Sequence, residues 1–234
     1  MHTRLSALIL AALLALNLHA AGPDFAAIVE SSFDDVNWDF EQEFAFTETL
    51  MSGDTRTVAR FDPSSPEKQQ WTLLSFDNRP PSVEETESFL EAKSREQGHH
   101  KGSGNDGVLE LVNTDSLVLI EETADYWLLS FRPDFDEEDK DDRKFFKHMA
   151  GELRIAKDDG AIEYMDIRNT KPIRPIIGAK IKSMVMRFEF GRATEKGPLV
   201  LTHVSAGARG SAMLVVRFNE LETYEFSDFV YVGD

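Results

Sequence analysis

The sequence predicts a mainly β protein with a few helices, built as one large antiparallel meander. Three observations support this fold class: the last quarter of the chain is a series of apolar strand patterns, an early segment alternates aromatic with polar residues, and short turn sequences separate the expected strands. The length of 234 residues, less about 20 at the N-terminus, suits a single all-β domain. We therefore expect one domain over residues 22–234.

The last quarter of the chain predicts four consecutive strands. They lie at 181–190, 199–204, 211–218 and 221–232, and Gly207 and Gly210 follow the second of them as breaks. Apolar side chains fall on both faces of these strands, whereas an antiparallel sheet with one wet face alternates cleanly. We therefore expect the second face to be covered or to line an apolar cavity.

The first 21 residues have the pattern of a cleaved secretory signal. Arg4 precedes a short apolar run from Leu5 to Leu16, and small residues follow at Ala20 and Ala21. The run is shorter than the ~20 apolar residues of a membrane span; a retained N-terminal anchor is the alternative. We expect a signal peptide at 1–21, cleavage near Ala20 to Ala21, and a periplasmic mature protein.

Composition excludes several classes of partner and site. The chain has no cysteine, which excludes disulfides and lipoprotein acylation. Its net charge of -17 repels a phosphate backbone, so nucleic acid is not an expected partner. The acidic segment from Asp134 to Asp142 invites calcium, but an EF-hand loop would need glycine and glutamate where Asp139 and Phe145 stand. We expect a solvated loop there and no metal site.

The first hundred residues predict two helices. Asp24 is a candidate N-cap for a helix over 25–33. The capping-box spacing of Ser82 and Glu85 predicts a second helix that ends near residue 97. Because this second helix has few apolar positions, we expect it to lie on the surface or to close over another element.

Aromatic alternation predicts the first strands. Residues from Trp38 to Phe46 alternate apolar with polar and predict a strand with a buried aromatic face. The turn Ser52-Gly53-Asp54 joins it to a strand over 55–61, and a third strand follows at 70–76.

The middle of the chain predicts five strands after a polar connector at 99–107. They lie at 108–112, 116–122, 126–132, 145–155 and 161–168. The Asp-Gly step within Lys157 to Gly160 is a hairpin signal between the last two. The expected strands therefore follow one another in meander order.

Residue types that carry catalysis are not grouped along this sequence. No His-Glu-x-x-His, Gly-x-Ser-x-Gly or phosphate-binding glycine pattern is present, and His148 and His203 each stand alone on an expected strand. A hydrolase whose Ser, His and Asp come from distant positions is the remaining enzymatic alternative. We expect a protein that is not an enzyme and uses no cofactor.

The functional signal in the sequence is apolar. Aromatic and methionine side chains recur on the expected strands, and a concave sheet lined with them suits an acyl chain or another apolar ligand; an ordinary core is the alternative. The candidate ligand-binding residues are Trp38, Phe40, Phe44, Phe46, Trp71, Leu73, Met184, Met186, Phe188, Phe190, Met213 and Phe226.

Two short motifs and the order of the elements carry a family resemblance. The chain ends in Tyr224-Glu-Phe-Ser-Asp-Phe229, and Lys157-Asp-Asp-Gly-Ala-Ile162 precedes a strand. This layout resembles the outer-membrane lipoprotein-sorting proteins, the LolA/LolB/RseB-like superfamily. The resemblance implies an unclosed half-barrel with helices covering its concave face, where acyl chains of a lipoprotein or another lipid bind. It also implies a basic residue near the cavity, for which Arg56, Arg60 and Lys182 are candidates.

Two functions follow as hypotheses. The first is a soluble periplasmic carrier or binding protein for lipoprotein acyl chains or other lipids, a LolA-like lipid-binding domain. The second is an envelope protein-interaction or regulatory module whose sheet edge or concave face binds a segment of a membrane protein. Because the chain lacks cysteine, it is not expected to be the lipid-anchored receptor form of the family.

Overall fold

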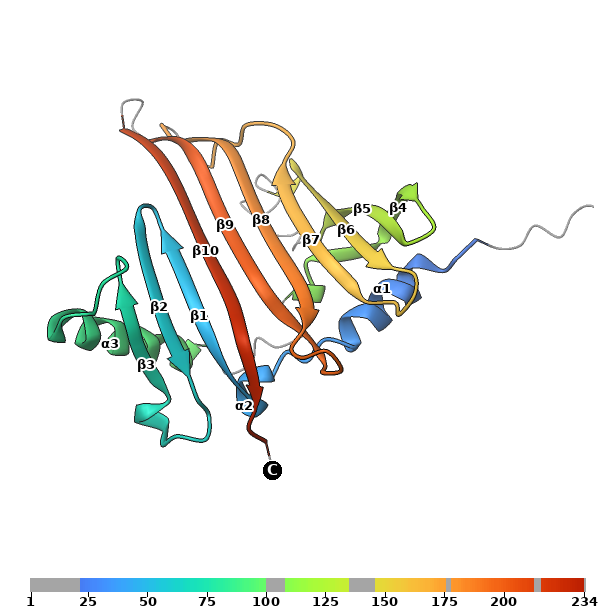
Figure 1. Cartoon of the computed structure of the whole chain (residues 1–234). Helices are drawn as coiled ribbons and strands as arrows, with labels where there is room; N and C mark the ends of the chain where they lie inside the picture. Colours follow the sequence, from blue (N-terminus) through green and yellow to red (C-terminus); the bar gives the residue numbers. More distant parts are fainter. Residues whose placement is uncertain (1–21, 100–107, 135–145, 176–177, 213–215, 234) are drawn as a thin grey trace, which may run out of the picture.

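The structure is a computed structural model that describes residues 22–99, 108–134, 146–175, 178–212 and 216–233 (Figure 1). The predicted signal peptide, most of the acidic segment and Met213 lie outside these residues. The helices are α1 (Phe25–Asp34), α2 (Phe40–Glu43) and α3 (Val83–His99), with a 3-10 turn at Glu67–Gln69. The strands are β1 (Phe44–Ser52), β2 (Thr55–Phe61), β3 (Trp71–Phe76), β4 (Val112–Glu122), β5 (Tyr126–Pro133), β6 (Met149–Ala156), β7 (Ile162–Asn169), β8 (Lys180–Arg192), β9 (Leu199–Ala212) and β10 (Val216–Tyr231).

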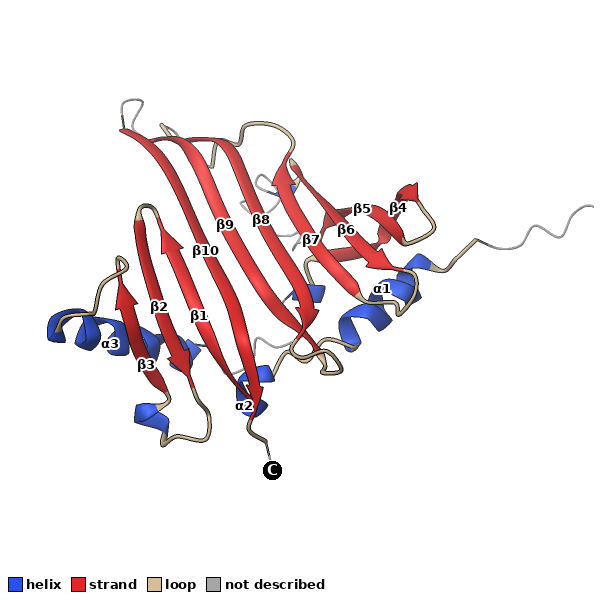
Figure 2. Ribbon diagram, in the orientation of Figure 1, coloured by secondary structure: helices blue, strands red, loops and turns tan. Residues whose placement is uncertain are grey.

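The ten described strands form one antiparallel sheet, which confirms the predicted fold class. Their order is β3-β2-β1-β10-β9-β8-β7-β6-β5-β4, so β4 to β10 follow one another as a meander and β10 returns beside β1. The two outermost strands, β3 and β4, do not pair with each other, and the sheet stays open (Figure 2). Its curvature brings β4 and β5 behind the plane of the central strands (Figure 1).

One row of side chains crosses the whole sheet on a single face. Directly opposed residues of antiparallel neighbours point to the same side, so the strand registers define the row from edge to edge. From β4 to β3 its members are Leu119, Leu129, Leu153, Met165, Phe188, Val204, Tyr224, Leu50, Thr57 and Phe76. Both α1 and α3 pack on this face, which we call the concave face.

Helix α1 seals the concave face over β4 to β8. The Asp24 carboxylate accepts a hydrogen bond from the Ala27 amide at 3.3 Å, as predicted for the N-cap. Val29 and Phe33 are fully buried, and the Phe33 ring lies against Phe190 of β8. The Ser32 hydroxyl donates to the Gly160 carbonyl in the β6–β7 turn at 2.7 Å. Apolar packing and this hydrogen bond fix α1 on the sheet.

A cluster of rings forms the core under the other half of the sheet. Phe46 is fully buried, and rings of four other elements surround it at centroid distances of 5.1 to 6.0 Å. The surrounding rings are Phe40, Phe61, Trp71, Phe226 and Phe229. Three of these pairs are edge-to-face and two are tilted. Aromatic pairs stabilise by ~0.5–1.5 kcal/mol beyond burial.

The opposite, convex face carries ion pairs over β6 to β8, so the expectation that both faces are apolar was wrong there. Arg187 of β8 binds Asp166 of β7 at 2.8 Å and Glu189 of its own strand at 2.5 Å. Arg168 pairs with Glu152 in the same layer. The alternation of charged with apolar residues along β7 and β8 is the pattern of a sheet with one wet face.

The last quarter contains three described strands, not the predicted four. Gly207 and Gly210 lie within one continuous strand, β9. Side chains of β10 lie close to both glycines. A Cβ added at Gly210 would lie 2.4 Å from the Phe218 ring, and one at Gly207 would lie 3.0 Å from Leu221 Cδ1. The glycines therefore admit these side chains instead of ending the strand.

Three further expectations about element boundaries were wrong. Residues 40–43 form the short helix α2, so the predicted strand at Trp38 begins only at Phe44. Residues 108–109 are helical and β4 starts at Val112, while β6 starts at Met149 rather than 145. The hairpin turn at Gly160, with φ of 72°, and the β1–β2 hairpin at Gly53 are confirmed.

Candidate functional site

The candidate site is the part of the concave row that the helices do not seal. Phe188, Val204, Tyr224, Leu50 and Phe76 are each half-buried, and we call these five residues the open row. They lie on β8, β9, β10, β1 and β3, and only the buried Thr57 of β2 interrupts them. The open row therefore forms a continuous, largely apolar strip across six adjacent strands.

Small residues widen the strip on one side. Along β9, Ala206 and Ala208 follow Val204 on the same face, opposite Met186 and Met184 of β8. Both methionines are half-buried, and Ala206 is exposed on this face. Methionine side chains adapt to irregular apolar partners, so the β8 side of this region is suited to a flexible ligand, whereas Glu222 and Glu220 of β10 lie opposite Ala206 and Ala208.

A cleft of about 540 Å³ lies at the other end of the strip, between α3 and the sheet. The cleft includes Leu50 and Phe76 of the open row together with Phe89 of α3. Its remaining lining residues are Thr57, Ser82, Glu84, Glu85 and Ser88. The cleft thus has an apolar floor on the sheet and a polar rim on the first turns of α3, the arrangement of an amphiphile site.

A buried ion pair holds the middle of α3 to the concave face. Lys93 Nζ of α3 lies 2.8 Å from the Glu48 carboxylate of β1, and both residues are less than a tenth exposed. The ammonium also lies over the Trp71 ring, 4.5 Å from its centroid, and 6.0 Å from the Tyr224 ring. The pair places opposite charges inside an otherwise apolar layer, which makes it costly to break.

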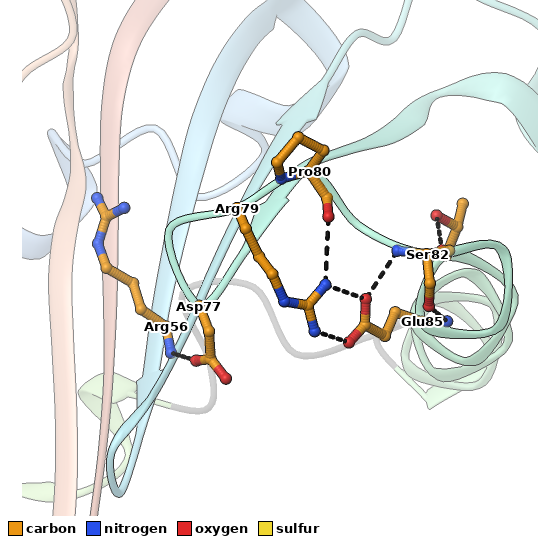
Figure 3. A network of polar contacts seen from close by, with 7 residues as sticks. Arg56, Asp77, Arg79, Pro80, Ser82 and Glu85 are labelled. Carbon is orange, nitrogen blue, oxygen red and sulfur yellow. Dashed lines mark hydrogen bonds and ion pairs between the residues drawn. The ribbon is translucent and has the colours of Figure 1, made fainter.

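The beginning of α3 is fixed by the network in Figure 3. The Ser82 amide donates to Glu85 at 2.7 Å, and the Glu85 amide donates to the Ser82 hydroxyl at 3.2 Å, which confirms the predicted capping box. The Arg79 guanidinium binds both Glu85 carboxylate oxygens, at 2.5 and 2.9 Å. The Arg79 hydrogen bonds and the Ser82 amide lower the pKa of Glu85 from 4.5 to about 2.

The twelve sequence-predicted site residues divide between core and open face. Buried residues of the core are Phe40, Phe44, Phe46, Leu73 and Phe190. Half-buried residues are Trp38, Trp71, Met184, Met186, Phe188 and Phe226, and Met213 lies outside the described residues. Trp38 packs between Phe33 and Phe190 and donates its indole N–H to the Phe33 carbonyl. Among the described candidates, Phe188 belongs to the open row, Met184 and Met186 continue it along β8, and Phe226 follows Tyr224 on β10.

Sequence reasoning missed the ion pair and the α3 side of the cleft. A signal for Glu48 was present in the sequence. Glu48 follows Phe44 and Phe46 on the same face of β1, so an acidic residue occupies a position where a buried side chain is expected. Lys93 is one turn beyond Phe89 on a helix with few apolar positions, a pattern that does not reveal a distant partner.

The basic residues suggested for the cavity lie elsewhere. Arg56 and Arg60 alternate with Thr57 and Ala59 and so point to the convex face. Arg60 donates there to the Asp228 carbonyl at 2.9 Å. Lys182 is at the far end of β8, and Lys93 is the basic residue beside the open row.

Within the described ranges, no three His, Asp or Glu side chains are grouped as metal ligands would be. None of the described helices combines the length and hydropathy needed to span a membrane. His148 lies in the turn before β6, not on a strand as expected, and His203 lies on β9 opposite Glu189 and Glu225.

Comparison with family models, curated proteins and solved structures found no match to this chain.

Proposed function

We propose that this protein is a non-catalytic periplasmic carrier or binding protein for the acyl chains of a lipoprotein or another lipid. The observation that carries the proposal is the open row, a half-buried apolar strip that crosses six strands on a face otherwise covered by helices. A folded protein gains by burying such a strip, and an apolar ligand supplies the missing cover.

The dimensions of the strip suit an acyl chain. From Phe188 to Phe76 the open row crosses five strand spacings, or ~24 Å at ~4.8 Å each. One leaflet of a bilayer is ~15 Å of hydrocarbon, half of the ~30 Å core. A single extended acyl chain therefore fits along the row, with its polar end at the rim of the α3 cleft.

The energetic gain comes from transfer of methylene groups out of water. At ~0.8 kcal/mol per methylene, a chain that buries ~10 methylenes gains ~8 kcal/mol before the cost of ordering it. The resemblance of the layout to lipoprotein-sorting proteins supports the same class of cargo.

Two substitutions on one strand test the proposal. Met186→Glu places a carboxylate beside the open row, whereas Val185→Glu places one on the convex face, where Val185 is 39% exposed. We expect Met186→Glu to weaken binding of a fluorescent fatty acid at least ~100-fold, because an unpaired charge against an acyl chain costs several kcal/mol. Val185→Glu should bind like the unmodified protein.

Circular dichroism and urea titration establish that both variants are folded. Equal affinity in the two variants would exclude the open row as the binding site. Phe44 is unsuitable for such a test because it is 3% exposed in the core, so a charge there would unfold the protein. Mass spectrometry of an organic extract of the gently purified protein then identifies the bound lipid.

A second candidate function rests on edge strand β4. Val118 and Ile120 are 59% and 51% exposed at the edge of the sheet, where backbone groups are available for pairing. A segment of an envelope membrane protein that added a strand there would make this a regulatory module. Photo-crosslinking from position 118 should then capture one membrane protein, and Ile120→Lys should abolish that capture while leaving fatty-acid binding intact.

A further inference from the structure

A basic pocket lies on the convex side of the sheet, at the end where β8 begins. It has a volume of about 380 Å³ and is lined by Lys182, Arg209, Gly210, Arg217, Phe218 and Asn219. Arg209 of β9 pairs with Ser183 of β8 and with Asn219 of β10. The register shift between Ile181 and Ser183 inserts Lys182 into this ladder as an extra residue. The strand register therefore brings the three cations together.

The three cations differ from four arginines elsewhere on the sheet. Arg187, Arg168, Arg154 and Arg192 each form an ion pair with a carboxylate. Across the described chain, no carboxylate forms an ion pair with the three cations of the pocket. In a protein with 42 acidic and 25 basic residues, this pocket brings together three cations that have no ion pair within the described ranges. Their mutual repulsion favours binding of an anion.

Neighbouring residues extend the positive charge. The Asn169 side chain donates to the carbonyls of Lys171 and Lys182, at 2.8 and 3.2 Å, which brings the β7–β8 connection to the pocket. Lys180 is opposite Ser211 at the same end of the sheet. Glu220 and Glu222, the nearest acids on β10, have the opposite parity to Arg217 and belong to the concave face. This end of the convex face is thus a basic surface on an acidic protein.

The composition of the pocket identifies the kind of anion. Two guanidinium groups, one ammonium and the Asn219 amide supply donors suited to the several oxygens of a phosphate group. Leu221, which shares the parity of Arg217, is an exposed apolar side chain on this face at 53% exposure, and Phe218 lines the pocket. Basic residues beside exposed apolar ones are typical of surfaces that lie on anionic lipids rather than of sites for free phosphate.

We propose that this basic end docks the protein on an anionic phospholipid surface, with a headgroup phosphate in the pocket of Lys182, Arg209 and Arg217. The interaction goes beyond cargo binding and does not depend on it, because the pocket and the open row lie on opposite faces of the sheet. An anionic lipid surface is chosen as the partner because its charge is opposite to that of the pocket. The rest of the protein is negatively charged and is repelled by such a surface, which orients the basic end toward the lipid.

Vesicle flotation with the purified protein tests the proposal. Vesicles that contain phosphatidylglycerol should bind the protein, phosphatidylcholine vesicles should not, and added salt should weaken binding. Removing all three cations with Lys182→Gln, Arg209→Gln and Arg217→Gln should weaken binding ~100-fold, at roughly 5-fold per basic residue. A control with Lys68→Gln, Arg132→Gln and Lys196→Gln makes the same change in net charge on other surfaces and should retain binding.

Two results would overturn the proposal. One is equal vesicle binding by the two triple variants, which would mean that net charge alone governs association. The other is calorimetric binding of inorganic phosphate, abolished by the pocket variant, without binding of the vesicles, which would make this a soluble-phosphate site. Fatty-acid binding measured on the same variants keeps the two proposals separate, since a loss of vesicle binding alone leaves the open row unaffected.

Discussion

Helices α1 and α3 cover opposite ends of the same sheet face with different chemistry. Beneath α1, the row residues Leu129, Leu153 and Met165 are fully buried. Beside α3, the same row continues as half-buried side chains and a cleft, and the helix is held by a buried ion pair and a polar cap. The same row of opposed strand residues is therefore a sealed core beneath the apolar face of α1 and a half-buried surface beside the polar contacts of α3.

The largest effect is expected at the sealed end. Phe33→Ala removes a fully buried ring that stacks on Trp38 and lies edge-on to Phe190, and it should lower the free energy of unfolding by ~3–5 kcal/mol. Urea titration measures this change. Leu90→Ala on α3 is the matched control, since Leu90 is 36% exposed, and it should change stability little. A similar loss in both variants would erase the distinction between the two ends.

An intermediate effect is expected from the buried charge at the open end. Lys93→Met leaves Glu48 buried without its ammonium partner and should lower the free energy of unfolding by ~3 kcal/mol. This value is at the lower end of the range for a broken buried ion pair, because α3 can move and let water reach the carboxylate. Hydrogen exchange should increase most in α3. Adding Glu48→Leu should restore most of the stability. If the double variant were no more stable than Lys93→Met, the ion pair would not be what holds α3.

The smallest effect is expected at the cap of α3 and depends on pH. The pKa of Glu85 is lowered in the folded state, so its stabilisation is present above pH ~4.5 and is lost as the pH falls toward about 2. We expect the start of α3 to loosen across this interval, measured by amide exchange of residues 83–86. Glu85→Gln should remove this pH dependence, while Glu91→Gln, on the exposed side of α3, should retain it.

Local signals predicted much of this fold, because they act within a few residues. Gly53 and Gly160 adopt positive φ in the turns where hairpins were expected, and Asp24 and Ser82 cap their helices as predicted. The alternation of apolar and polar residues was a less reliable indicator of a strand near Trp38, because a short segment with apolar residues at both ends also fits one turn of a helix. The structure resolves that ambiguity through the Asn37 side chain, which accepts from the Asp39 amide.

The open row depends on register between distant strands, which a single sequence does not specify. Tyr224 meets Leu50 on one side and Val204 on the other, although these residues come from three separate segments. The aromatic and methionine content correctly indicated a large apolar face, yet it did not separate Phe46, which is core, from Phe188, which is half-buried. Partners such as Lys93 and Glu48 are likewise set by tertiary contacts.

The position of β10 between β1 and β9 has a consequence for how the chain folds. In the described sheet, the N-terminal hairpins pair with the later meander through the sixteen-residue strand β10, where Phe44 pairs with Tyr231. Until that strand arrives, β1 and β9 both present unpaired edges, and the joining contacts span nearly the whole described sequence. Such non-local pairing folds slowly and exposes strands to aggregation. Aggregation through these two edges is therefore expected mainly in the interval before β10 is in place.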